Sequence, residues 1–169
     1  MFRPLSRIAG SFLLVALVPA AHAQSTTLSI SGNVLPGTCT LTAPAIALDA
    51  VKADEMTAAT PAKVKAGALN FTGCVGVKRA RLSFDGIAAS GDPERWENTA
   101  KTTPATGVSI ALLSGSTGSN YLKKGSTATV TVGGATATYP LRAGYYIPTT
   151  GGINAGNVTT EIVITAAYD

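Results

Sequence analysis

The expected fold is decided by the C-terminal stretch Asn157-Val158-Thr159-Thr160-Glu161-Ile162-Val163-Ile164-Thr165-Ala166-Ala167-Tyr168-Asp169. Its even-numbered side chains are mostly apolar and share one face of an extended strand, whereas the odd-numbered side chains share the other face. Since the sequence ends with this strand, we expect no later strand beside it. An apolar strand at an open sheet edge promotes aggregation. We therefore expect a cover, either the chain's own N-terminal strand or a strand from another molecule.

The segment at residues 26–34 is a second amphipathic strand. Thr26, Leu28, Ile30, Gly32 and Val34 share one face, and polar side chains occupy the other. Burial of the three large apolar side chains would contribute roughly 2 kcal/mol each, while ordering the segment costs roughly 1–2 kcal/mol per residue. Gly32 interrupts the bulky series, which suggests a close backbone approach at that point. Alone, the segment should be disordered, and it should form a strand only on a sheet that accepts it.

The rest of the chain favours short strands separated by clusters of Gly, Pro, Ser and Asn. We predict an all-β sandwich. Gly133-Gly134 is typical of a two-residue hairpin turn and predicts that the strands on either side pair with each other. Trp96 is expected to cover the core beneath a long polar connection rather than to mark a ligand surface. The predicted strands are residues 68–72, 79–84, 108–113, 127–132, 135–141 and 141–147, with a short strand near Trp96 and a helical turn near residues 54–59.

The first 23 residues have the features of a signal peptide. Arg3 and Arg7 precede an apolar run at residues 8–18, and Ala21-His22-Ala23 places small residues where a signal peptidase cuts. The run is shorter than the roughly 20 apolar residues of a membrane-spanning helix. We therefore expect export, no membrane span in the mature chain, and a mature chain that begins at Gln24. The predicted domains are a signal peptide at 1–23, an N-terminal extension at 24–34 that continues into the first strand, and a single domain at 35–169.

The two cysteines, Cys39 and Cys74, are expected to form a disulfide, because an even number of cysteines in an exported chain is normally paired. Closing a loop of this length stabilises a fold by about 4 kcal/mol in the chain-entropy model. Two buried free thiols are the alternative.

Charge and histidine content exclude several classes of function. The chain has 13 Lys and Arg against 9 Asp and Glu, and loss of Arg3 and Arg7 with a signal peptide lowers the net charge from +4 to +2. So mild a balance predicts no nucleic-acid partner. The single histidine is His22, so the mature chain has no Ser-His or Cys-His arrangement and no His-ligated metal site. We expect no enzyme activity, no metal and no cofactor.

Several stretches of the sequence form a recognisable series, which resembles the subunits of chaperone–usher pili, the family of type 1 fimbriae. The most specific match is at the C-terminus, where Gly156 lies fourteen residues from the end and Tyr168 is a penultimate aromatic residue after alternating apolar positions. The segments around the two cysteines and a central segment also match, in the family's order. These segments are residues 27–34 followed by Cys39, residues 68–74, residues 97–99 and residues 107–113.

The resemblance implies an immunoglobulin-like β-sandwich that lacks its last strand, with an N-terminal donor-strand extension. It implies a structural subunit that polymerises by donor-strand exchange in a cell-surface fimbrium and supports cell adhesion. The implied partners are neighbouring pilus subunits, a periplasmic chaperone whose basic side chains hold the terminal carboxylate, and an outer-membrane usher. The implied donor-strand residues are Thr26, Leu28, Ile30, Gly32 and Val34. The implied residues of the groove that accepts the chaperone or donor strand are Gly156, Val158, Thr160, Ile162, Ile164, Ala166, Tyr168 and Asp169.

Two other classes of function stay open at the level of sequence. In a secreted module that binds a carbohydrate or protein ligand, residues 26–34 would pair within their own chain, and the basic group at positions 78–81 could form a binding patch. We interpret that group as solvated charges or as protection of a strand edge. An enzyme would need acids gathered in one pocket, and we interpret Asp92, Glu94 and Glu97 as solvated loop charges.

Overall fold

The computed structural model describes residues 27–148 and 152–169. The chain divides into two units, Met1–Asn33 and Val34–Asp169. The expected signal peptide and Thr26 lie outside the described residues. In the first unit, residues 27–33 form no strand, and the side chains of Leu28 and Ile30 are exposed. All strands of the described residues belong to the second unit.

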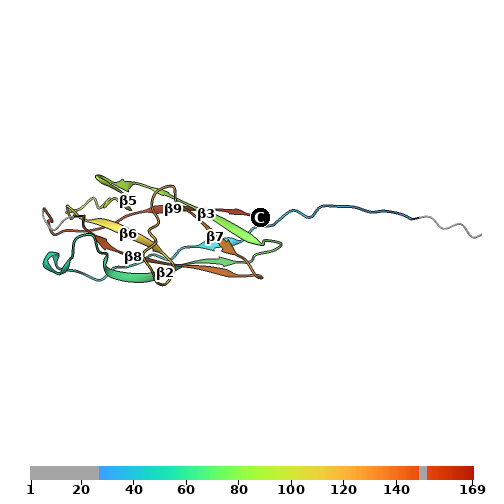
Figure 1. The fold of residues 1–169 in the computed structure, drawn as a ribbon, viewed down its shortest axis with the longest axis horizontal. Helices are drawn as coiled ribbons and strands as arrows, with labels where there is room; N and C mark the ends of the chain where they lie inside the picture. Colours follow the sequence, from blue (N-terminus) through green and yellow to red (C-terminus); the bar gives the residue numbers. More distant parts are fainter. Residues whose placement is uncertain (1–26, 149–151) are drawn as a thin grey trace, which may run out of the picture. The chain divides into compact units, whose positions relative to one another are not determined.

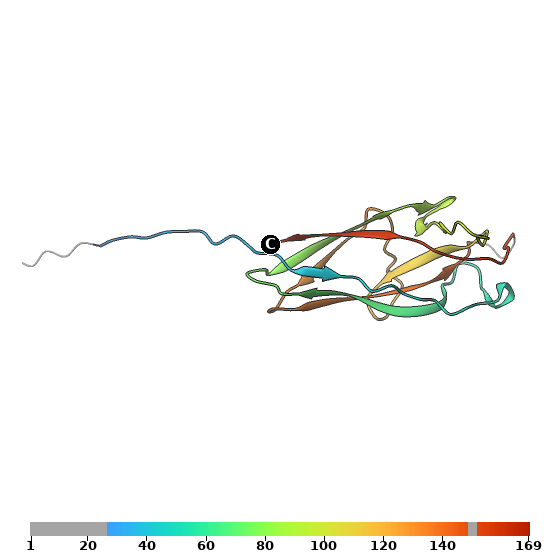
Figure 2. The same ribbon diagram turned by 180° about the vertical axis from the view of Figure 1, so that it is seen from behind.

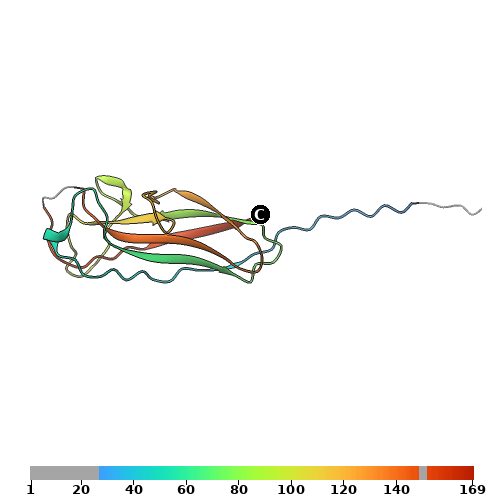
Figure 3. The same cartoon turned by 60° about the horizontal axis from the view of Figure 1, so that its bottom comes forward.

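The second unit is a β-sandwich of two antiparallel sheets (Figure 1). The larger sheet has the order β1-β2-β8-β6-β5-β4, and the smaller has the order β7-β3-β9. Figure 3 shows β2, β8 and β6 side by side in the larger sheet. The bounds are β1 (Thr40–Thr42), β2 (Ala62–Thr72), β3 (Arg79–Gly86), β4 (Ala88–Ala89), β5 (Asp92–Trp96), β6 (Ser109–Ser114), β7 (Thr127–Thr131), β8 (Ala137–Tyr146) and β9 (Ile162–Tyr168), with a 3-10 turn η1 (Ala53–Glu55) between β1 and β2.

The core lies between the two sheets, where alternating side chains of each strand meet. In β3, the side chains of Ala80, Leu82 and Phe84 are buried and alternate with exposed polar ones, as expected for a strand with one face on the core. The side chain of Trp96 is fully buried, and its Nε1–H donates a hydrogen bond to the carbonyl of Leu122 at 2.7 Å. The prediction that Trp96 covers the core is confirmed. All-β architecture is confirmed as well.

The predicted hairpin at Gly133-Gly134 is wrong. β7 pairs with β3, whereas β8 pairs with β2 and β6, so the chain crosses from one sheet to the other at residues 132–136. A glycine pair permits either a tight hairpin turn or a connection that crosses between the sheets. The burial of β7 in one sheet and of β8 in the other decides for the crossing. The two strands predicted at 135–141 and 141–147 are one strand, β8, which runs through Pro140.

The disulfide between Cys39 and Cys74 is confirmed. It joins the residue before β1 to the turn after β2, so it fixes β1 at one edge of the larger sheet. The alternative of two free thiols is therefore wrong. Within residues 27–148 and 152–169, no helix is long and apolar enough to cross a membrane.

Candidate functional site

The C-terminal strand β9 has an open edge. It pairs with β3 on one side, and no strand of the described residues pairs with its other side. Asp169 and Arg79 exchange two backbone hydrogen bonds, of 2.8 and 3.0 Å. Because hydrogen-bonded and non-bonded pairs alternate in an antiparallel ladder, the odd-numbered residues of β9 bond to β3. The even-numbered residues therefore turn their backbone N–H and C=O groups toward the open side.

The same even-numbered residues carry the side chains that face the core. Those from Val158 to Tyr168 are half-buried and the apolar ones pack against the core, while the odd-numbered side chains from Thr159 to Ala167 are exposed. This confirms the alternation predicted from sequence. Figure 2 shows β9 (red) and β1 (cyan) on the face of the sandwich turned toward the viewer. One row of residues thus presents unpaired backbone groups and incompletely buried apolar side chains together. We call it the β9 edge, defined by residues 158–168.

The edge strand of the other sheet lies across from the β9 edge. The hydroxyl of Tyr168 donates a hydrogen bond of 3.0 Å to the carbonyl of Cys39, just before β1. Leu41 and Ile46 are half-buried and also pack against the core. Ile46 fits over Gly67 of β2, where a Cβ atom would lie 2.6 Å from Ile46 Cδ1. The core is therefore only partly covered between β9 and β1, as expected for a sandwich without its last strand.

A pocket of about 390 Å³ opens near the start of the C-terminal run. It is formed by side chains from the η1 segment, from β8 and from the run itself, most of them apolar. Val158 belongs both to this pocket and to the β9 edge. The main apolar lining residues are Leu48, Val51, Met56, Tyr145, Ile153 and Val158.

The regular strand starts later than the sequence pattern predicts. β9 begins at Ile162, and residues 157–159 bond instead to the irregular segment at residues 98–105. Gly156 is pressed against that segment, since a Cβ atom would lie 2.4 Å from the carbonyl oxygen of Thr103 and 2.5 Å from the amide of Ala105. Such distances are too short for any side chain. Gly156 is therefore required for a close approach of two backbone segments.

The terminal residue Asp169 is held by the chain's own basic group. Its side chain lies 2.9 Å from Arg79 Nη2 and 3.8 Å from Arg81 Nη2. Its main-chain oxygen accepts hydrogen bonds of 2.8 Å from the backbone N–H groups of Lys78 and Arg79. Arg79 and Arg81 are thus ion-pair partners of the end of β9, on an exposed sheet face.

The predicted donor-strand residues of the described part carry exposed side chains. Leu28 is 82%, Ile30 88% and Val34 94% exposed, and no atom approaches within 4 Å of where a Cβ of Gly32 would lie. Residues 27–34 form no strand. Their role as a donor strand stays a prediction.

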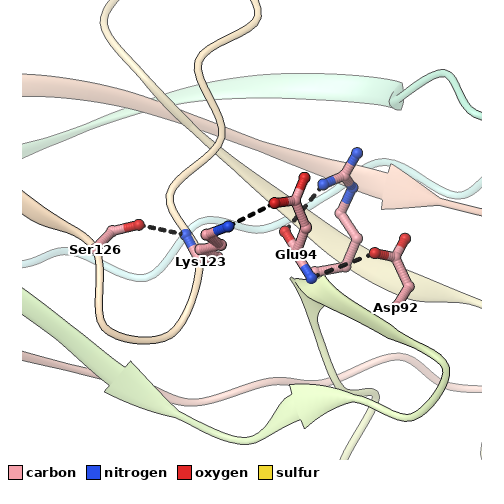
Figure 4. A network of polar contacts seen from close by, with 5 residues as sticks. Asp92, Glu94, Lys123 and Ser126 are labelled. Carbon is pink, nitrogen blue, oxygen red and sulfur yellow. Dashed lines mark hydrogen bonds and ion pairs between the residues drawn. The ribbon is translucent and has the colours of Figure 1, made fainter.

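The acidic residues of the β4–β5 region are exposed at Glu94 and half-buried at Asp92 and Glu97. Glu94 pairs with Lys123 at 2.5 Å, Asp92 accepts a hydrogen bond from the N–H of Glu94, and Ser126 Oγ accepts one from the N–H of Lys123 (Figure 4). The hydrogen bond and the charge of Lys123 hold the pKa of Glu94 below its ordinary value. Among the described residues, no group of His, Cys, Asp or Glu could hold a metal ion. The prediction of solvated loop charges is right only for the exposure of Glu94, because Asp92 and Glu94 belong to strand β5 and both Asp92 and Glu97 are half-buried.

A buried arginine escaped the sequence analysis. The guanidinium of Arg95 lies between two aromatic rings, 3.6 Å from the centroid of Tyr121 and 4.0 Å from that of Tyr146. Cation–π contacts of this kind offset part of the cost of burying a charge. Strand alternation could have placed Arg95 opposite Trp96, on the other face of β5, but nothing local in the sequence shows that Tyr121 covers it.

A family model described as fimbrial protein matches residues 28–169. The chain gives no significant match to curated protein sequences. Three similar solved structures share the fold at identities below 25%. They are a Burkholderia pseudomallei antigen and type I fimbria protein (19% identity, 79% of this chain and 91% of that chain, TM-score 0.60), the P pilus rod subunit PapA (13%, 79% and 100%, 0.63) and the CupB6 tip adhesin from Pseudomonas aeruginosa (17%, 78% and 38%, 0.63).

The family model spans the described domain and the strand-like segment before it, including both cysteines and the whole β9 edge. Its match agrees with the resemblance seen in the sequence, and the solved structures agree with the two-sheet fold. This chain belongs to the fimbrial protein family.

Proposed function

We propose that this protein is a non-enzymatic structural subunit of a chaperone–usher fimbria, exported through the periplasm to the cell surface, where it polymerises by donor-strand exchange and supports cell adhesion. The observation that carries the proposal is the β9 edge, where unpaired backbone groups and half-buried apolar side chains occur on the same residues. A strand added there would form ladder hydrogen bonds and cover the core at once.

The segment at residues 26–34 has the composition of such a strand. Its apolar side chains recur at every second residue, with the period of the β9 edge. Leu28 and Ile30 are exposed, and their burial on a neighbouring subunit would return roughly 2 kcal/mol each. Backbone hydrogen bonds would hold the two subunits together, and the apolar side chains together with Gly32 would set the register in which the two strands pair. This supports lending of the segment rather than pairing within its own chain.

A periplasmic chaperone would cover the β9 edge before assembly. An uncovered edge beside apolar side chains promotes aggregation during export. Basic side chains of the chaperone would reach the terminal carboxylate, and they would compete there with the backbone amides of Lys78 and Arg79, which already bind it. At the outer-membrane usher, the next subunit's strand would replace the chaperone's strand.

Catalysis is not part of this proposal. Glu94 is paired with Lys123, and Glu97 accepts a hydrogen bond of 2.6 Å from the backbone N–H of Ser90. These contacts use the acids to hold the turns around β4 and β5. A secreted module with a self-paired N-terminal strand is disfavoured because residues 27–34 form no strand.

The proposal is tested by deleting residues 24–31 and expressing the mature chain with its cognate chaperone. The deleted chain should still copurify with the chaperone, because its β9 edge is intact, yet it should fail to enter the groove of a second subunit. A wild-type chain that is a stable monomer without chaperone, and that unfolds on this deletion, would show that the segment pairs within its own chain.

A second variant distinguishes the register of strand pairing between subunits from the covering of the β9 edge by the chaperone. Gly32→Trp should slow assembly of subunits without weakening the chaperone complex, since Gly32 is expected to contact only the neighbouring subunit. Equal assembly rates for Gly32→Trp and the wild type would contradict the role assigned to Gly32.

A further inference from the structure

The carboxamide of Asn98 lies against the start of the β9 edge. Its Nδ2 donates a hydrogen bond of 2.9 Å to the carbonyl of Asn157, and its Oδ1 accepts one of 3.0 Å from the N–H of Thr159. The side chain therefore binds both backbone neighbours of Val158. In a parallel sheet, a residue bonds in the same way to the two residues that flank its partner. The Asn98 side chain thus takes the place of a strand residue opposite Val158.

The Asn98 side chain takes the place of a strand residue at a point where the three-stranded sheet has already ended. β3 stops at Gly86, which is paired with Ile162. Beyond that pair, no strand of the described residues lies beside residues 157–161. The segment that follows β5 occupies the place of a strand, and Thr99 also donates its backbone N–H to the carbonyl of Thr159 at 2.7 Å.

The bonds keep the alternation of β9 unchanged through the irregular part. Asn157 donates its backbone N–H to Thr103 and accepts from Ala105, at 2.8 and 2.9 Å. Together with the bonds of Thr159, these satisfy the backbone groups of Asn157 and Thr159 on the side away from the opening. Val158 and Thr160 have no backbone hydrogen bond among the described residues. Their groups therefore continue the open row that begins at Ile162.

The Asn98 side chain is itself held in place. Its Nδ2 also donates to the carbonyl of Ala105 at 2.9 Å, and its Oδ1 also accepts from the N–H of Ala100 at 3.2 Å. The residue is half-buried. A side chain with all its bonds made loses little further entropy when a partner binds, so the start of the edge is already arranged.

We propose that Asn98 is a positioning residue that lengthens the β9 edge by residues 158–160 and so sets how much of a partner strand can pair. This inference rests on the proposed function. The first part of the acceptor edge is then held in position by the Asn98 side chain rather than by a neighbouring strand. The length of the joint between subunits then depends on one carboxamide located sixty residues from Val158 in the sequence.

The test uses the wild-type chain and Asn98→Asp, each purified as its complex with the cognate chaperone. Three synthetic peptides displace the chaperone: residues 26–34, residues 28–34 and residues 26–32. Asn98→Asp keeps the acceptor toward Thr159 but places a second carboxylate oxygen against the carbonyls of Asn157 and Ala105, where Nδ2 donated. We expect the longest peptide to displace the chaperone about tenfold less effectively from this variant, as for loss of one or two net hydrogen bonds.

The shortened peptides distinguish a positioning role of Asn98 from a general destabilisation of the fold by the substitution. In the wild type, both truncations weaken displacement. In Asn98→Asp, only one truncation should still weaken displacement of the chaperone. The truncation that removes the peptide residues opposite Val158 and Thr160 should have no further effect. The other truncation should weaken displacement as much as it does in the wild type. Unchanged sensitivity to both truncations would overturn the inference. If no peptide displaces the chaperone from the wild type, the proposed function fails and the inference fails with it.

Two further variants complete the experiment. Asn154→Asp is the matched control, because Asn154 Nδ2 bonds to Thr106 Oγ1 at 2.9 Å in the same pair of segments without touching residues 157–160. It should respond to all three peptides as the wild type does, and a loss like that of Asn98→Asp would overturn the inference. If Asn98→Asp does not accumulate as a complex, Asn98→Ser replaces it. Its side chain is too short to reach both Asn157 and Thr159, so the same loss of one truncation effect is expected.

Discussion

The three-stranded sheet has two edges, β9 and β7, and both present unpaired backbone groups within the described residues. Directly after β7, Val132 donates its N–H to the carbonyl of Lys78 at 2.9 Å. By the alternation of an antiparallel ladder, Thr127, Thr129 and Thr131 turn their backbone groups away from β3. Each edge could therefore form ladder hydrogen bonds with a further strand.

The two edges differ in what their outward-turned residues carry. On β7 these residues have exposed threonine side chains, whereas on β9 they have half-buried side chains such as Ile162 and Ile164, which pack on the core. A strand added to β9 would bury apolar surface at roughly 25 cal/mol per Å², and a strand added to β7 would exchange only water for backbone bonds. An open edge becomes a binding site when the apolar side chains beside it are also incompletely covered.

The largest effect should come from a charge placed in the apolar row. Ile164→Arg puts a guanidinium where the core needs an apolar side chain, so capture of a partner strand should fall at least about a hundredfold. Chaperone copurification and fibre assembly measure the loss. Thr129→Arg is the matched control on β7, and both measurements should remain at the wild-type level. Equal losses from the two variants would show that both edges take part in assembly.

An intermediate effect is expected at Gly156. The Cβ atom of Gly156→Ala would press on Thr103 and Ala105, and the backbone segments must separate to accept it. We expect a loss of about 1–3 kcal/mol in the free energy of unfolding. Gly133→Ala, after β7, meets no atom within 4 Å and should be neutral. Denaturant unfolding of both variants measures the difference, and a neutral Gly156→Ala would contradict the close approach.

The smallest effect concerns the ion pair between Glu94 of β5 and Lys123 of the connection that precedes β7. Lys123 lowers the pKa of Glu94 in the folded chain, so the pair stabilises the fold above the ordinary pKa of an unfolded glutamate, and that stabilisation disappears as the pH falls through the lowered pKa of the folded chain. Both side chains are exposed, so the gain is small. The melting temperature of Glu94→Gln should lie slightly below that of the wild type at pH 7, and the two should converge as the pH falls through the lowered pKa of Glu94. A difference in melting temperature that stays constant across this pH range would exclude the ion pair as its cause. Capture of a partner strand should be the same for Glu94→Gln and the wild type.

Most strands could be predicted because a half-buried strand repeats its pattern every two residues. The alternation at Ala80, Leu82 and Phe84 and that from Val158 to Tyr168 are visible in the sequence. The Gly133-Gly134 hairpin failed because the same two strands satisfy their alternation equally well in different sheets. Which strand lies next to which depends on contacts between residues far apart in the sequence.

The sequence by itself determined the all-β class, the disulfide pair and the face of residues 158–168 that turns inward, because these follow from local periodicity and from the presence of two cysteines. Tertiary structure alone decided that β9 pairs with β3, that Asn98 replaces a strand beside Asn157 and Thr159, and that the backbone at Gly156 lies too close to Thr103 and Ala105 to accept a side chain without moving. The physical reason is that a backbone group is free or bonded according to the segment beside it, and that segment comes from elsewhere in the chain.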